Sequence, residues 1–168
     1  MILMKNHLNK IVIVGNSGSG KSYLANQLGF VLKIPVIHLD KLFWKSNVFS
    51  QKRGKEIVYQ DILDLTKADK WILEGVFGDL ASVATPRADT LIFLNKTWVE
   101  CEEALLSRGP QTATQENFEE LVVWAGEYWD RKTLSSFEGH KKIFEQFEGI
   151  KLQLDSRVQT EAWLKGLI

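Results

Sequence analysis

The sequence predicts an α/β fold in which helices cover both faces of a parallel β-sheet. Two observations predict this class. Short apolar segments of strand length alternate along the chain with longer segments whose apolar residues recur at helical spacing. In addition, a glycine-rich loop joins the first of these strands to the first helix, as in many parallel α/β domains. The length of 168 residues and an ordinary apolar content indicate one domain, spanning 1–168, with a substantial core.

Five segments are expected to form strands, joined by right-handed crossovers. Four of them are almost entirely apolar, which is typical of parallel strands that are buried on both faces. The last alternates between apolar and polar residues, which favours a place at the edge of the sheet. The expected strands are 10–14, 35–39, 70–73, 90–94 and 150–154.

Helices are expected in most of the intervals between these strands. In one interval, Thr97 and Glu100 form a capping box at the start of a helix. A long amphipathic helix is expected from Phe118 onward, with a bend near Gly139. The expected helices cover 20–32, 54–68, 97–107, 118–148 and 156–167.

The loop after the first strand reads G-N-S-G-S-G-K-S, a complete phosphate-binding motif of the form G-x-x-x-x-G-K-[ST]. Its glycines let the backbone curl, so that successive N–H groups face a nucleotide phosphate at a helix N-terminus. The lysine would reach the terminal phosphates, and the last serine would ligate Mg²⁺. The motif therefore predicts binding of ATP and Mg²⁺ by Gly15, Asn16, Ser17, Gly18, Ser19, Gly20, Lys21 and Ser22.

The composition argues against several other classes of protein. Cys101 is the only cysteine, so the chain has neither a disulfide framework nor a cysteine-based metal site. The formal net charge is zero, which makes a nucleic-acid partner unfavourable. No segment has the features of a signal peptide or the length of a membrane span. A cytoplasmic protein without a membrane partner is therefore expected, while the oligomeric state is not predicted.

Charge is distributed unevenly along the chain. Residues 41–55 hold five basic side chains and no acidic one, whereas residues 100–149 hold eleven acidic and five basic side chains. Both segments are consistent with ordinary solvated faces. Alternatively, the basic stretch, which also contains Phe43, Trp44 and Phe49, receives an anionic or phosphorylated substrate.

Three further segments accompany the phosphate loop: I-P-V-I-H-L-D-K-L-F-W-K at 34–45, K-W-I-L-E-G at 70–75 and R-A-D-T-L-I-F-L at 87–94. In order and spacing they resemble the bacterial adenylate-kinase-related proteins often labelled topology modulation protein. The resemblance covers about 12–155. It implies the three-layer P-loop NTPase fold of nucleoside-monophosphate kinases, with strand order 2-3-1-4-5. It also implies a substrate-binding insert at about 41–69 and a lid at about 108–117.

Two carboxylates follow strands where open α/β sheets place ligand contacts. In kinases similar to this chain, a carboxylate at the position of Asp40 binds or deprotonates the acceptor hydroxyl; the alternative is a cap for a helix that begins near Lys41. The resemblance gives Glu74 a role in holding Mg²⁺, and the alternative is a cap or a salt bridge. His38 is expected to be a satisfied residue near the core rather than a catalytic base.

Arginines are expected to surround the transferring group, because charge spreads over its oxygens in the transition state. The resemblance points to Arg108 at the lid entrance and Arg131 on the long helix after it, each with a surface position as the alternative. Arg157 follows the fifth strand and is a candidate for stacking on adenine. Arg87 is expected to pair with Asp89, and contact with the substrate is the alternative.

Three features depart from the expected pattern, the first two from that of the resembled family and the third from that of adenylate kinases proper. Asn95 ends the fourth strand, where the family has an aspartate that supports Mg²⁺. The segment 109–117 has no basic residue, whereas such lids are usually rich in arginine. No arginine follows Glu74 and Gly75, which argues against AMP as the acceptor.

Together these features predict an ATP- and Mg²⁺-dependent phosphotransferase. It would transfer the γ-phosphoryl group of ATP to an unidentified small acceptor, either a small molecule or a nucleotide-like compound. The alternative is a nucleotide-binding regulatory protein with little or no phosphotransfer, which the three departures favour.

Overall fold

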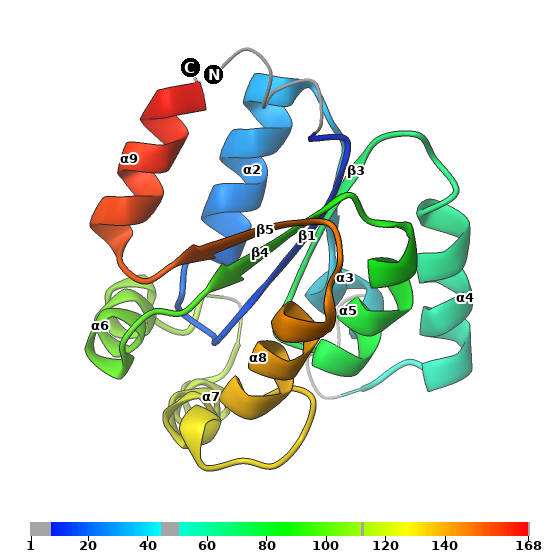
Figure 1. Cartoon of the computed structure of the whole chain (residues 1–168). Coiled ribbons are helices and arrows are strands. Elements are labelled where there is room, and N and C mark those ends of the chain that lie inside the picture. The colour runs from blue at the N-terminus through cyan, green and yellow to red at the C-terminus, as the bar shows by residue number, and fades with distance from the viewer. Residues whose placement is uncertain (1–7, 45–50, 112, 168) are drawn as a thin grey trace.

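The computed structural model describes residues 8–44, 51–111 and 113–167, which form a five-stranded sheet between two layers of helices (Figure 1). The strand order is β2-β3-β1-β4-β5, and every neighbouring pair is parallel. The fold class and strand order expected from the sequence are therefore confirmed.

The strands lie close to their expected positions. Those with apolar sequences, β1, β3 and β4, are buried along almost their whole length, whereas most residues of β5 are exposed at the edge of the sheet. Their bounds are β1 Lys10–Gly15, β2 Val36–His38, β3 Trp71–Glu74, β4 Thr90–Leu94 and β5 Ile150–Leu154.

Two apolar clusters separate the sheet from its helices. Because side chains alternate along a strand, Ile11 and Ile13 of β1 belong to the cluster under α2 and α9, and Val12 and Val14 belong to the opposite one. Helices α4, α5 and α8 cover that second face (Figure 1). The helices are α2 Lys21–Leu32, α3 Leu39–Phe43, α4 Lys55–Leu65, α5 Gly78–Ala84, α6 Trp98–Arg108, α7 Gln115–Gly126, α8 Phe137–Gln146 and α9 Arg157–Leu167, with 3₁₀ turns η1 Thr85–Arg87 and η2 Glu127–Trp129.

The expected long helix at 118–148 is wrong. Helix α7 ends at Gly126, η2 follows, and α8 begins only at Phe137. The break lies at 130–136 rather than near Gly139. There Ser136 caps α8 by accepting from the amide of Gly139, while Ser135 accepts from the amide of Gly78. The connection is therefore stabilised by contacts with α5, a helix that the sequence analysis did not predict.

His140 links α8 to the end of β3. It is fully buried, and its ring lies between the Tyr128 hydroxyl at Nδ1, 2.7 Å away, and the Val76 carbonyl at Nε2, 2.9 Å away. A carbonyl only accepts, so we assign Nε2–H as the donor and Nδ1 as the acceptor of a neutral imidazole. Burial lowers the pKa of His140 from 6.5 to about 3.

The buried neutral imidazole of His140 is expected to make the folded state less stable in acid. Below pH 6.5 the unfolded chain binds a proton at His140 that the folded chain excludes, so stability falls as the pH drops toward 3. Between pH 7 and pH 5 the loss is expected to be about 2 kcal/mol. Urea unfolding at both pH values should show this loss in the wild type but not in His140→Gln. Tyr128→Phe keeps the buried imidazole and should retain the loss; an equal pH dependence in His140→Gln would contradict the assignment.

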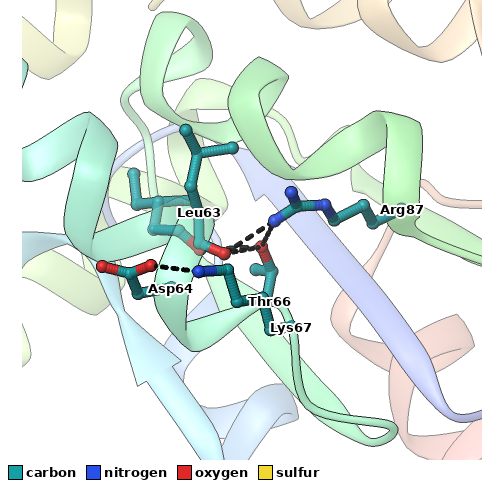
Figure 2. Close-up of polar contacts among 6 residues, drawn as sticks. Leu63, Asp64, Thr66, Lys67 and Arg87 are labelled. Atoms are coloured by element: carbon teal, nitrogen blue, oxygen red, sulfur yellow. Dashed lines mark hydrogen bonds and ion pairs between the residues drawn. The ribbon is translucent and has the colours of Figure 1, made fainter.

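Arg87 does not pair with Asp89, so that expectation is wrong. Its Nη1 donates to the Leu63 carbonyl at 2.6 Å and to Thr66 Oγ1 at 3.0 Å (Figure 2). These acceptors belong to the C-terminal end of α4, where a helix leaves carbonyl groups without internal partners. Asp89 instead accepts from the backbone amides of Asn9 and Lys10.

Two smaller features complete the description. Thr97 accepts from the amide of Glu100, which confirms one half of the capping box, while the Glu100 carboxylate accepts from the amide of Arg157. Among the described residues, no helix is long and apolar enough to cross a membrane.

Candidate functional site

The phosphate-loop motif connects β1 to α2 in a tightly turned conformation. Gly18 and Gly20 have φ values of 78° and 91°, in the left-handed region that favours glycine. A Cβ atom at Gly18 would also lie 2.3 Å from the Cys101 carbonyl oxygen of α6. The sequence of the loop is therefore matched both to its own turn and to the close approach of α6.

Asn16 anchors the loop to α7, 109 positions away in the sequence. Its Nδ2 donates to the Ala125 carbonyl at 2.9 Å, and its Oδ1 accepts from the Ser17 amide at 2.8 Å. The side chain is 1% exposed. Asn16 therefore fixes the loop to α7, a role that the sequence motif does not reveal.

Lys21 lies in the loop with its ammonium group facing inward. Nζ donates to the Asn16 carbonyl at 2.6 Å, and the residue is buried. Burial lowers the pKa of Lys21, and the carboxylates of Glu74 and Asp40 only partly oppose this effect. In the same loop, the hydroxyl of Ser19 is buried without a hydrogen-bond partner among the described residues. A buried cation and an unpaired hydroxyl suit a bound phosphate chain.

Glu74 is the centre of a hydrogen-bonded group at the ends of β2 and β3. Its Oε1 accepts from Ser22 Oγ at 2.9 Å and contacts His38 Nδ1 at 2.6 Å. His38 and Glu74 are partners in the register of these parallel strands, which explains their proximity. Burial alone would raise the pKa of Glu74, but the contacts with His38, Lys21 and Ser22 outweigh it and lower the pKa.

The ionised carboxylate of Glu74 can only accept, so we assign Nδ1–H of His38 as the donor. The sequence analysis expected His38 to be a satisfied residue near the core, and it missed this partner. The pairing of β2 with β3 was the signal that could have found it, because both residues end their strands.

Asp40 lies in the first turn of α3, directly after β2. The helix begins at Leu39, so Asp40 does not cap a helix that starts near Lys41. Asp40 keeps access to solvent, but surrounding protein atoms displace much of its water and raise its pKa. Lys21 opposes this shift and Glu74 adds to it. Asp40 therefore shares one electrostatic environment with the phosphate-loop lysine.

Arg108 and Arg157 line the same hollow, which has a volume of about 470 Å³. Arg108 ends α6 and Arg157 begins α9, and both are exposed. The positive charge of Arg108 also contributes to the lowered pKa of Lys21. These two predicted residues therefore line one hollow, and Arg108 is also close enough to the phosphate loop to act on Lys21.

Arg131 lies elsewhere than expected, because it follows η2 instead of belonging to a long helix. Its guanidinium stacks over the Trp124 ring at 3.8 Å and donates to the backbone carbonyls of Trp124 and Ser135. Burial lowers the pKa of Arg131. In this conformation Arg131 stabilises the connection between α7 and α8, and its expected contact with phosphate stays a prediction.

Asn95 Nδ2 donates to Asp155 Oδ1 at 3.0 Å, linking the ends of β4 and β5. Within the described parts of the chain, no group of three or more His, Cys, Asp or Glu side chains is arranged to hold a metal ion. Mg²⁺ bound to ATP would need an oxygen ligand from the protein beside the phosphates. The Ser22 hydroxyl fits this purpose, since its oxygen can bind a cation while its proton is donated to Glu74.

Comparisons of the sequence with known families and proteins do not show the family of this chain. No protein-family model matches the sequence, and a search of curated proteins finds no relative, so the resemblance to the topology modulation proteins stays a prediction.

Among solved structures, the chain is similar to shikimate kinase from Acinetobacter baumannii, with a TM-score of 0.59, 12% identity and coverage of 95% of this chain and 90% of the kinase. It is also similar to a gluconokinase from Sinorhizobium meliloti 1021, with a TM-score of 0.57, 15% identity and coverage of 96% and 94%. A shikimate kinase from Bacteroides thetaiotaomicron gives a TM-score of 0.56 at 18% identity, with 94% of each chain covered. At these identities the similarity shows the fold alone, which is that of P-loop kinases.

Proposed function

We propose that this chain is an ATP- and Mg²⁺-dependent phosphotransferase that acts on a hydroxyl group of a small acceptor. One observation carries the proposal: the phosphate-loop residues Lys21 and Ser22 meet Glu74 and Asp40 at the carboxyl ends of β2 and β3. Open parallel sheets bind their ligands at this edge. The P-loop kinase fold supports the same conclusion.

ATP would bind along residues 15–22. Their amides and the Lys21 ammonium group would hold the phosphates, with Ser22 as the protein ligand of Mg²⁺ and Glu74 holding that hydroxyl in place. Bound Mg²⁺ would offset the negative charge of the phosphate oxygens. Arg108 and Arg131 would add positive charge on the lid side, at about 108–117, and Arg157 would contact the adenine.

Asp40 would orient the acceptor and take its proton. In the reaction, the acceptor oxygen forms a bond to the γ-phosphorus, the bond from that phosphorus to the bridging oxygen breaks, and ADP leaves. The proton of the hydroxyl group passes to Asp40 and then to water. The raised pKa of Asp40 improves it as a base, because proton transfer becomes more favourable as the pKa approaches the working pH. A supply of ATP is consistent with the cytoplasmic location expected from the sequence.

Replacing Asp40 by asparagine tests the acceptor side. Asp40→Asn keeps the size of the side chain but cannot accept a proton, so kcat is expected to fall about 10²- to 10⁴-fold. The KM for ATP should change little. The raised pKa means that ionised Asp40 costs stability above its ordinary pKa, so Asp40→Asn should unfold at the same or a higher temperature at pH 7.

The first experiment is ADP release from Mg·ATP, alone and with pools of nucleosides, nucleotides and hydroxylated metabolites that include gluconate and shikimate. Stimulation by one pool, lost in Asp40→Asn, is the expected result. Nucleotide binding without stimulation by any pool would contradict the proposal and favour a regulatory protein.

A further inference from the structure

The basic stretch at 41–55 is less available to an anionic substrate than its sequence indicates. The structure describes residues 41–44 and 51–55 of it; Lys45 and Phe49 lie outside the described residues. Arg53 forms an ion pair with Asp61 at 2.8 Å and donates from Nη1 to the Leu42 carbonyl at 3.1 Å. Its guanidinium is therefore used within the protein.

Two more cations of the stretch also have partners within the protein. Lys55 forms an ion pair with Asp79 at 2.7 Å, and its hydrogen bond to that carboxylate raises the pKa of Lys55. The ammonium group of Lys52 lies over the Phe43 ring, 5.6 Å from its centre. Much of the positive charge that the sequence shows is thus balanced by carboxylates or directed onto a ring.

The groups beside the reacting hydroxyl are carboxylates. Asp40 and Glu74 both lie at this edge, and Lys21 and Arg108, which act on Asp40, are assigned above to ATP. A phosphate group on the acceptor would meet these carboxylates with few cations to offset the repulsion. The edge therefore suits hydroxyl groups, which donate to carboxylates without adding charge.

An aromatic pair lies one helical turn from Asp40. Phe43 follows Asp40 by three positions in α3, so the two side chains share a helix face. Phe77 follows Glu74 by three positions at the start of α5, and the rings of Phe43 and Phe77 are 4.2 Å apart. Neither residue is fully buried. Both rings also pack against the apolar cluster on this face of the sheet, and Lys52 lies over Phe43, so the part of the pair that stays exposed offers a limited apolar surface to a ligand.

From these contacts we infer that the acceptor is an uncharged, hydroxylated compound with a planar or apolar part, as in a nucleoside, and not a phosphorylated one. The inference rests on the proposed function. Asp40 binds the hydroxyl group and Phe43 and Phe77 contact the planar part. The cations of 52–55 are engaged by Asp61, Asp79 and the Phe43 ring, so that among the described residues of the stretch Lys41 alone is available to a phosphate.

The test compares nucleosides with their own 5′-monophosphates as acceptors of phosphate from Mg·ATP, using adenosine, guanosine, cytidine and thymidine. For at least one pair, kcat/KM is expected to be about tenfold or more higher for the nucleoside. Equal or better use of the monophosphate would overturn the inference, as would stimulation by gluconate or shikimate alone. Neither result would contradict the proposed function. Absence of stimulation by every compound would instead contradict the proposed function itself.

A matched pair of variants tests the cause of the preference. Asp61→Asn releases the guanidinium of Arg53 and is expected to reduce the preference for the nucleoside about three- to tenfold. Asp64→Asn makes the same change on the same helix but affects only exposed contacts, the ion pair with Lys67 and a hydrogen bond with Gln60, so the preference should stay the same (Figure 2). Equal effects of the two variants would overturn the role of Arg53.

Phe77→Leu tests the aromatic surface separately. It should raise the KM for the nucleoside about tenfold and leave the KM for ATP unchanged. Calorimetric titration measures binding of the same nucleoside without ATP and does not depend on turnover. The affinity for the nucleoside should fall in parallel with the rise in KM. Unchanged nucleoside binding by Phe77→Leu would overturn the assignment of this ring.

Discussion

Replacing Lys21 by methionine is expected to lower kcat for phosphoryl transfer by about 10²- to 10³-fold. Lys21 is the buried cation of the phosphate loop, and its ammonium group is already held by the Asn16 carbonyl at 2.6 Å. In the transition state the charge on the phosphoryl oxygens would lose the cation that the loop itself supplies. Methionine fills a similar volume without charge, so the fold should persist.

The effect of Lys21→Met should also appear in nucleotide binding. Mg·ATP at 100 times its Kd is expected to stabilise the wild type by about 2.7 kcal/mol, and the gain should be much smaller in the variant. Thermal unfolding with and without Mg·ATP measures this difference. Lys165→Met, at an exposed lysine of α9, is the matched control and should behave like the wild type. Full activity in Lys21→Met would contradict the assignment of the phosphate loop.

Replacing Gly78 by alanine is expected to destabilise the fold by about 3 kcal/mol or more. A Cβ atom at Gly78 would lie 1.9 Å from the carbonyl oxygen and 2.6 Å from the carbonyl carbon of Leu134. Both are backbone atoms, so no side-chain rotation relieves the clash. The segment 130–136 is itself held by Arg131 and by the hydrogen bond from the Gly78 amide to Ser135.

Gly166→Ala is the matched control for this change. Gly166 lies in α9 and has no atom within 4 Å of the site that a Cβ would occupy. Alanine there should stabilise the protein by roughly 0.5–1 kcal/mol, because glycine disfavours a helix. Urea unfolding measures both variants. Wild-type stability in Gly78→Ala would contradict the packing of 130–136 against α5.

Features that depend on local sequence could be predicted. The apolar strands and the phosphate loop are encoded by neighbouring residues, so their positions along the chain agree with the structure. The order of the strands in the sheet was implied by the resemblance to adenylate-kinase-related proteins. The cap at Thr97 is equally local. Helix α5 was missed because it has only seven residues and many of them are small, which leaves a weak apolar pattern.

Features that depend on contacts between distant residues could not be predicted. The break at 130–136 depends on Gly78, about fifty positions earlier, and nothing near Gly139 marks it. Arg87 had a local partner in Asp89, but the carbonyl groups at the end of α4 compete successfully for its guanidinium. A sequence pattern shows which groups are present but does not show which distant partners satisfy them.

The same limit applies to the candidate site. The motif and strand ends pointed to Lys21, Ser22, Asp40 and Glu74, which the structure brings to one edge of the sheet. The link from His38 to Glu74 and the anchoring of Asn16 by Ala125 required the folded chain. In the basic stretch at 41–55, the partners of Arg53 and Lys55 could not be predicted either, because Asp61 and Asp79 lie outside it.

The central claim is that this chain transfers the γ-phosphoryl group of ATP to a hydroxyl group. The most direct measurement follows ³²P from γ-labelled Mg·ATP after incubation with each nucleoside, with its monophosphate and with the pools of hydroxylated metabolites, using chromatography to separate the products. The account predicts labelled nucleoside monophosphate, dependent on Lys21 and Asp40, in excess of labelled inorganic phosphate. Label that stays in ATP or appears only as inorganic phosphate, whatever acceptor is present, would contradict it.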